Sequence, residues 1–291
     1  MRTIALDFPK SILIETCNIC QGKCIFCPYS NIRKGNDIYI LEKDIIERLL
    51  YEIKKYYVER ISLFNNNEPL LDNRIYEIIR TTRDILPDVE ITLSTNGILL
   101  KEETVKKLYL AGLSALYISI PTLIDKDYKT IMGYNIIHIL EVIRNLHNSK
   151  YIKIIKIAIP KALSFNPDEF KKEFTEKGIE ICPWEIEYIT NWKLNLSEMR
   201  QYFAMNKTTV SCDRPMDQAV ITSNGNMLLC CRDWHEEIIL GNIKSDTIYN
   251  IWHNNKTKAI QELISKQEYN KISLCRKCSM AKVNLSFDTS R

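Results

Sequence analysis

The sequence SILIETCNICQGKCIFCP, residues 11–28, places a cysteine-rich loop directly after a short run of apolar and β-branched residues. In this loop Cys20, Cys24 and Cys27 are separated by three and then two residues. Three thiolates at this spacing can hold one four-iron cubane and leave its fourth iron without a protein ligand. That open iron can bind and reduce a small molecule, whereas a cluster with four cysteine ligands usually serves electron transfer or structure. The loop therefore predicts an iron–sulfur site with an open position.

The same cysteines are compatible with two other metal sites. A zinc knuckle is the first, because thiolates select zinc as readily as iron–sulfur clusters. The second is a four-ligand site that includes Cys17, which forms a CxxC pair with Cys20. Structural zinc sites usually complete a tetrahedral set from paired ligands. The spacing of the other three cysteines therefore favours iron.

The residues after this loop alternate between short β-branched runs and amphipathic helical stretches as far as about residue 190. This alternation is typical of βα units around a parallel sheet. We expect an α/β fold, a partial (β/α)6 parallel barrel over residues 1–190. The predicted strands are Ser11–Glu15, Arg60–Phe64, Glu90–Ser94, Leu116–Ile120, Lys153–Ile159 and Trp184–Ile189. The predicted helices are Glu42–Tyr57, Asn73–Leu86, Lys101–Ala111, Asn135–His147 and Asn166–Lys177.

The pattern changes after residue 190, which predicts a linker over residues 191–211 and a small α+β domain over residues 212–291. Its predicted elements are a hairpin over Gln218–Cys230 with an Asn224-Gly225 turn, and one helix near Asp246–Ile264. A terminal cysteine pair, Cys275 and Cys278, follows the helix.

Charge and hydropathy exclude several function classes. The 291 residues carry 40 basic and 36 acidic side chains, interspersed along the chain, for a net charge of +4. This pattern offers no basic stripe for a nucleic acid and no polybasic membrane patch. The chain also lacks a signal-peptide core and an apolar run long enough to span a bilayer. A cytoplasmic protein that acts on a small molecule or a peptide is expected, in which ten cysteines indicate metal binding or catalysis rather than disulfides.

The cysteine loop resembles the signature of the radical S-adenosylmethionine (SAM) superfamily, CxxxCxΦC, matched here by Cys20, Cys24, Phe26 and Cys27. The resemblance implies that Cys17 is not a ligand. It also implies that the open iron of a [4Fe-4S] cluster binds SAM, and that one electron cleaves the sulfonium to a 5′-deoxyadenosyl radical. The protein then positions the cofactor and excludes water.

Three further motifs follow the order that this resemblance requires. Where the superfamily usually shows Gly-Gly-Glu-Pro, this chain has Asn66-Asn67-Glu68-Pro69, and asparagine at positive φ is expected to preserve the turn. The loop Thr95-Asn96-Gly97 and the strand-end Ser119 are similar to the superfamily's other cofactor contacts. The implied SAM contacts are thus Phe26, Asn66, Asn67, Glu68, Thr95, Asn96, Gly97 and Ser119.

The second cysteine set resembles the auxiliary-cluster module called SPASM, or its shortened form, the twitch domain. Cys212, Cys230, Cys275 and Cys278 carry the resemblance, and four thiolates complete one cubane with no open iron. We therefore expect one auxiliary [4Fe-4S] cluster in addition to the SAM-binding cluster. A zinc ribbon built from the same four residues is the competing interpretation.

The two clusters together favour an oxidoreductase that abstracts hydrogen from a small polar substrate, such as a sugar or an aminocyclitol, and passes the second electron to the auxiliary cluster. A flavodoxin- or ferredoxin-type protein is the expected reductant. Because the first strand begins near residue 11, we expect no leader-peptide-binding domain, although peptide modification stays open. Two competing hypotheses are a redox-neutral epimerase with Cys231 as hydrogen donor, and a protein without catalytic activity that binds zinc or carries electrons.

Overall fold

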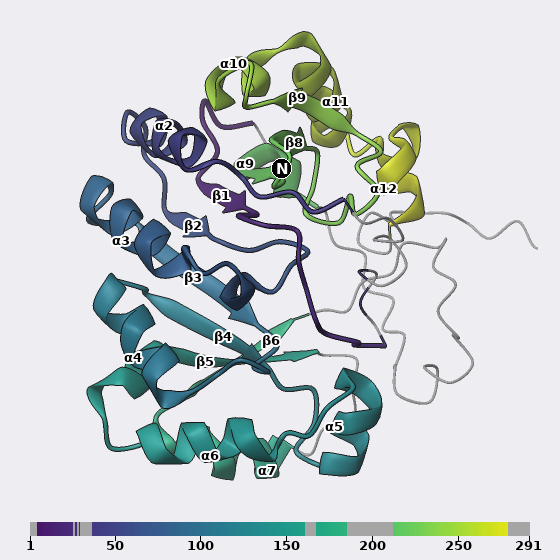
Figure 1. Cartoon of the computed structure of the whole chain (residues 1–291). Helices are drawn as coiled ribbons and strands as arrows, with labels where there is room; N and C mark the ends of the chain where they lie inside the picture. Colours follow the sequence, from purple (N-terminus) through teal and green to yellow (C-terminus); the bar gives the residue numbers. More distant parts are fainter. Residues whose placement is uncertain are drawn as a thin grey trace, which may run out of the picture.

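The computed structural model describes residues 5–25, 27, 29, 37–160, 167–184 and 212–278, and its centre is one mixed sheet (Figure 1). In the described part the strand order is β6-β5-β4-β3-β2-β1-β7-β8-β9, and the sheet is not closed into a barrel. Strands β1 to β6 pair in parallel, as the βα alternation predicts. Their bounds are β1 Ser11–Ile14, β2 Arg60–Ser62, β3 Glu90–Thr95, β4 Ala115–Ser119, β5 Ile155–Pro160 and β6 Glu180–Trp184.

Helices connect these strands and cover one face of the sheet. Figure 1 shows α2, α3 and α4 side by side along that face, with α6 and α7 beyond β4 and β5. The α-helices of this part are α2 Lys43–Ile53, α3 Ile75–Ile85, α4 Glu102–Ala111, α5 Asp125–Met132, α6 Ile137–Leu146 and α7 Pro167–Glu173. The 3₁₀ turns are η1 Pro69–Leu71, η2 Lys150–Ile154 and η3 Thr175–Lys177. No helix in the described ranges is both long and apolar enough to cross a bilayer.

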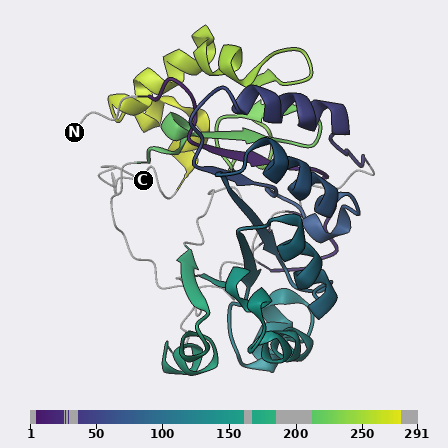
Figure 2. The same ribbon diagram turned by 90° about the vertical axis from the view of Figure 1, so that its left-hand side faces the viewer.

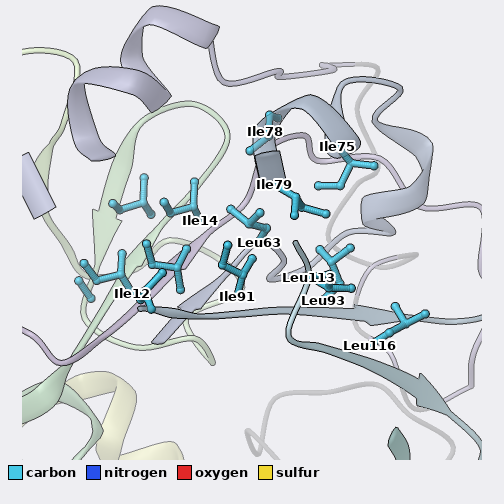
Figure 3. Close-up of a cluster of buried hydrophobic side chains, with 14 of the residues drawn as sticks. Ile12, Ile14, Leu63, Ile75, Ile78, Ile79, Ile91, Leu93, Leu113 and Leu116 are labelled. Carbon is cyan, nitrogen blue, oxygen red and sulfur yellow. The ribbon is translucent and has the colours of Figure 1, made fainter. Parts of the chain in front are cut away.

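The core lies between β1–β4 and the helices that cover them (Figure 3). Side chains on a strand alternate between the two faces, so Ile12 and Ile14 of β1 share this core while Leu13 faces the other side. The core side chains labelled in Figure 3 are all less than a tenth exposed: Ile12, Ile14, Leu63, Ile75, Ile78, Ile79, Ile91, Leu93, Leu113 and Leu116.

The C-terminal segment extends the same sheet. Strand β7, Gln218–Ile221, pairs in parallel with β1, and β8, Asn226–Leu228, forms the predicted hairpin with it around Gly225. Strand β9, Ile239–Asn242, completes this edge. Figures 1 and 2 show the remaining elements at the β1 end of the sheet: α9 Arg214–Asp217, α10 Ile248–His253, α11 Asn255–Ser265 and α12 Ser273–Lys277. The turn η4, Tyr269–Lys271, precedes α12.

Two predicted elements differ from the structure, and one helix was not predicted. The sixth strand begins at Glu180 and not at Trp184, because Glu180 to Trp184 pair with β5, and the rest of the predicted range Trp184–Ile189 lies outside the described residues. Helix α5 was not predicted, since its sequence is mostly polar and it buries only Tyr128, Ile131 and Met132. The single helix expected near Asp246–Ile264 is two helices, broken at Asn254, whose side chain caps α11 by accepting a hydrogen bond from the Thr257 amide. The predicted linker, residues 191–211, lies outside the described residues, and the division into two domains stays a prediction.

Candidate active site and auxiliary thiol site

The cysteine loop follows β1 and brings three thiols together. Cys24 interacts electrostatically with both Cys27 and Cys20, and Cys20 interacts with Cys27. Gly22 lies between them, where an added Cβ would be 3.3 Å from the Cys20 sulfur and 3.6 Å from the Cys24 sulfur. The Gly22 amide donates to the Cys20 sulfur at 3.3 Å, which fixes the direction of that thiol. The loop thus points three thiols toward one region.

The donor set fits an iron–sulfur cluster. Burial, together with the neighbouring thiols, raises the pKa of Cys24 to about 12, and burial raises that of Cys20 to about 11. Such thiols become thiolates when a metal compensates the charge. Three thiols on one loop can each bind a separate iron of a cubane, so this donor set suits such a cluster.

A buried amide next to these thiols also lacks a protein partner. In the described part of the chain, neither side-chain polar atom of Gln21 has a hydrogen-bond partner. Buried polar atoms are nearly always satisfied in folded proteins. The unsatisfied Gln21 amide is therefore consistent with a bound group at the cysteine loop.

Glu68 organises the loops at the ends of β2 and β3. Its carboxylate accepts hydrogen bonds from the Thr95 hydroxyl at 2.8 Å, the Asn96 amide at 2.7 Å and the Leu70 amide at 3.1 Å. The Glu68 amide in turn donates to the Ile19 carbonyl of the cysteine loop at 2.8 Å. The Asn96 side chain also reaches the Cys20 sulfur, at 3.8 Å. The structure thus joins the cysteine loop, the acidic loop and the Thr95-Asn96-Gly97 loop, as the sequence predicts.

The buried Glu68 carboxyl is expected to make stability depend on pH. Burial outweighs its hydrogen bonds and raises its pKa from 4.5 to about 7. The folded chain thus holds this proton more tightly than the unfolded chain, so stability falls as pH rises from 4.5 to 7 and is then constant. In urea unfolding, the free energy of unfolding of the cluster-free chain should fall by about 3 kcal/mol over this interval relative to that of the Glu68→Gln variant. If the difference in free energy of unfolding between the two chains did not change with pH, Glu68 would be ionised over the whole interval.

The loop Asn65–Asn67 turns by a different route from the one expected. Among the described residues only Glu236 and Gln267 are non-glycine residues at positive φ, so neither Asn66 nor Asn67 adopts it. Instead, the Asn67 side chain accepts a hydrogen bond from the Asn65 amide at 3.0 Å and closes the turn. Its amide group lies 3.8 Å from the sulfur of Cys17. The expected turn survives, but a side chain and not a left-handed backbone holds it.

Gly97 is held by both its backbone angle and its surroundings. Its φ is +84°, and an added Cβ would lie 2.6 Å from Ile139 Cδ1, a fully buried side chain of α6. Two phenols, of which Tyr128 is buried and Tyr134 half-buried, brace the same loop: Tyr134 donates to the Asn96 carbonyl, and Tyr128 contacts Tyr134 at 3.1 Å. The loop has little room to move.

Replacing Gly97 with alanine is expected to destabilise the fold and weaken SAM binding. The left-handed backbone costs about 1–2 kcal/mol for a residue with a Cβ, and the contact with Ile139 adds roughly 1–3 kcal/mol. Gly178→Ala is the matched control, because Gly178 has a φ of +77° and no atom within 4 Å of an added Cβ. Urea unfolding should therefore show a larger loss for Gly97→Ala. Equal losses would mean that Ile139 accommodates the methyl group.

The other predicted SAM contacts are placed as follows. Ser119 ends β4, half-buried, and its carbonyl accepts a hydrogen bond from the Tyr128 hydroxyl at 3.3 Å. The Asn66 amide donates to the Glu15 carboxylate at 3.0 Å. Phe26 lies outside the described residues.

The second thiol site combines residues that are far apart in sequence. Cys212 precedes α9, Cys230 follows β8, and α12 brings Cys275 with Cys278 directly after it. Cys275 interacts with Cys278 and Cys212, and burial together with these thiols raises the Cys275 pKa to about 12. Cys230 also interacts with Cys212. The four predicted thiols therefore converge, and the donor set suits a fully ligated cluster.

Cys231 lies within this auxiliary site. A hydrogen bond with Cys230 and the charge of Arg214 lower the pKa of Cys231, whereas burial raises it. The net result is a pKa of about 7. Its side chain also packs against Leu13 of β1 and Leu228 of β8. Its role as a hydrogen donor stays a prediction.

Sequence reasoning did not predict the role of Glu15, which connects the two sites. This fully buried carboxylate accepts hydrogen bonds from the Asn66 amide and, at 2.9 Å, from the Ser223 hydroxyl in the turn between β7 and β8. Arg214 and Tyr134 were also missed. A charged residue at the end of a buried strand is the one signal that could have identified Glu15.

Comparisons with known proteins match both parts of the chain that contain these thiols. A model of the radical SAM superfamily matches residues 14–174, more than half of the chain, and a model of the SPASM iron–sulfur cluster-binding domain matches residues 212–279. The S-adenosyl-L-methionine-dependent 2-deoxy-scyllo-inosamine dehydrogenase of Niallia circulans is 21% identical over 273 residues, which cover 94% of this chain and 93% of the relative.

Solved structures show the same fold over most of the chain. The crystal structure of BtrN in complex with AdoMet and 2-DOIA has a TM-score of 0.70 at 20% identity, and covers 98% of this chain and 96% of that chain. Streptococcus suis SuiB bound to precursor peptide SuiA has a TM-score of 0.72 at 17% identity, and covers 96% of this chain and 71% of that chain. From the family matches, the chain belongs to the radical SAM superfamily, as an enzyme that carries a SPASM domain and uses SAM and [4Fe-4S] clusters.

Proposed function

We propose that the enzyme oxidises a small polar substrate, an aminocyclitol or a similar sugar-like molecule, by two electrons. The observation that carries the proposal is the convergence of four thiols in an auxiliary site, since such a site can accept an electron from a substrate radical. The 2-deoxy-scyllo-inosamine dehydrogenase of Niallia circulans, which aligns over 94% of this chain, supports the substrate class.

In this proposal Cys20, Cys24 and Cys27 hold the SAM-binding cluster, and the loops of Glu68 and Asn96 hold SAM beside it. When bound, SAM and its cluster supply the 5′-deoxyadenosyl radical that takes a hydrogen atom from the substrate. Glu68 fixes the Thr95 and Asn96 loop through its hydrogen bonds and offers a carboxylate to the methionine ammonium group. The other contacts proposed for SAM are Phe26, Asn66, Asn67, Gly97 and Ser119.

Cys212, Cys230, Cys275 and Cys278 hold the auxiliary cluster in the same proposal. The cluster would supply an acceptor for one electron of the substrate radical, and loss of one proton would then complete the two-electron oxidation of a carbinol carbon to a carbonyl. A flavodoxin- or ferredoxin-type protein supplies the electron that cleaves SAM.

The test uses the anaerobically reconstituted enzyme with ring-deuterated 2-deoxy-scyllo-inosamine and a panel of deuterated aminocyclitols and sugars. A substrate should transfer deuterium to 5′-deoxyadenosine and yield a product that has lost that deuterium and one further hydrogen. A second reaction, with unlabelled substrate in D₂O, tests the epimerase hypothesis. A product of unchanged oxidation state that carries solvent deuterium would replace dehydrogenation by epimerisation with a donor such as Cys231. Turnover of peptides alone would contradict the proposed substrate class.

A further inference from the structure

A cationic side chain lies at the auxiliary thiol site. Arg214, in α9, is two residues after Cys212, and its guanidinium Nη1 lies 4.0 Å from the Cys231 sulfur. Burial lowers the Arg214 pKa, but its interactions with Cys231, Cys230, Cys212 and Cys278 outweigh burial and raise it. One guanidinium thus acts on three of the four proposed ligands.

The surroundings favour a strong electrostatic effect. Arg214 is partly buried, and the residues that follow it, Pro215 and Met216, are buried. Charges interact more strongly in such a setting than in water. Asp217 also interacts with Arg214, but its side chain is exposed, where solvent screens the charge.

The charge of an iron–sulfur cluster determines in which direction this guanidinium shifts the reduction potential of the cluster. A [4Fe-4S] cluster with four thiolates is anionic, and reduction adds one more negative charge. Net charge and solvent exposure are among the factors that set the potentials of such clusters. A cation beside the thiolates stabilises the reduced state more than the oxidised state, because it interacts with one additional negative charge.

We propose that Arg214 raises the reduction potential of the auxiliary cluster and so favours electron transfer from the substrate radical. The inference rests on the proposed function, in which the substrate loses a hydrogen atom to the deoxyadenosyl radical, one electron to the auxiliary cluster and one proton to solvent. Arg214 is a positioning residue in this scheme: its guanidinium lies beside Cys231 and acts on the electron acceptor's ligands through its charge, and it takes no part in bond cleavage.

The experiment measures the potential of the auxiliary cluster alone. Arg214→Gln and Arg214→Lys are made in a Cys24→Ala background, so that a single cluster is titrated, and each reconstituted full-length chain is reduced stepwise with detection by EPR. Arg276→Gln is the matched control, because Arg276 lies between Cys275 and Cys278 in sequence but is exposed. Iron content is measured for every variant.

Arg214→Gln is expected to shift the reduction equilibrium at least tenfold toward the oxidised cluster, which is 59 mV for a one-electron couple. Arg214→Lys and Arg276→Gln should each shift it by less than about threefold, or roughly 28 mV. Equal potentials in Arg214→Gln and Arg276→Gln would overturn the inference.

Loss of the cluster, or a different metal, would also decide whether the inference holds. Cluster loss in Arg214→Gln with full iron in Arg214→Lys would support the inference, because the site then requires the charge. Cluster loss in both variants would overturn it, since the guanidinium would then serve structure. Zinc in the parent chain would contradict the proposed function itself, which separates the two failures.

Discussion

Cys24→Ala is expected to abolish release of 5′-deoxyadenosine from SAM and to remove about four of the roughly eight irons that two cubanes contain. A cubane with two protein ligands instead of three loses one of its bonds to the protein. SAM then has no iron to bind. The measurements are iron and sulfide content after anaerobic reconstitution, and 5′-deoxyadenosine formed with dithionite.

Cys17→Ala is the matched control for this prediction. The Cys17 sulfur lies near the side chain of Asn67, and the charged groups that act on it are Asp72 and Glu15 rather than the three cysteines of the loop. The variant should keep about eight irons and cleave SAM at a rate close to that of the parent. If Cys17→Ala lost as much iron as Cys24→Ala, the four-ligand site that includes Cys17 would replace the three-cysteine assignment.

The parallel sheet and both thiol sites could be predicted because their signals are local. Strands β1 to β5 are short β-branched runs that lie within a few residues of the predicted ranges. The cysteine spacing on one loop places the thiols of Cys20, Cys24 and Cys27 together, since so short a loop cannot separate them far. The order of the motifs along successive strands then locates the acidic loop and the Thr95-Asn96-Gly97 loop at the same edge of a parallel sheet.

Features that depend on distant pairing could not be predicted. The Gln218–Ile221 run gives no sign that it pairs with β1, because strand pairing leaves no local pattern. Asn254 is read as a helix residue by periodicity, whereas its side chain accepts a local hydrogen bond and begins a new helix. No pattern in the sequence marks Tyr128 and Tyr134 as supports of the site, since tyrosine also packs in ordinary cores. For β7 and for Tyr134 the deciding partner lies elsewhere in the fold.

Glu15 connects the region proposed to bind SAM with the hairpin of the auxiliary site. Its carboxylate connects the Asn66 loop, proposed to hold SAM, with the Ser223 turn of the auxiliary hairpin, while β7 pairs directly with β1. The Glu15 link and the β1–β7 pairing thus both tie the hairpin to the part of the fold that precedes the cysteine loop. A fixed distance suits electron transfer from a substrate radical, because the acceptor does not need to move.

Cys275→Ala is expected to separate SAM cleavage from substrate oxidation. Loss of one ligand removes the auxiliary cluster, so about four irons should remain on Cys20, Cys24 and Cys27. SAM cleavage then continues within about tenfold of the parent, but the substrate radical has no acceptor, and oxidised product should fall by more than about a hundredfold, or roughly 2.7 kcal/mol in the barrier. The measurement is the ratio of 5′-deoxyadenosine to oxidised product.

The control for this prediction is Cys182→Ala, because Cys182 lies in β6 with its sulfur 3.5 Å from the Glu180 carboxylate and away from both thiol sites. Its ratio of deoxyadenosine to product should equal that of the parent. Undiminished oxidised product in Cys275→Ala would show that the electron leaves by another route. A redox-neutral product in both the parent and Cys275→Ala would instead favour epimerisation, because hydrogen return by a thiol such as Cys231 needs no electron acceptor.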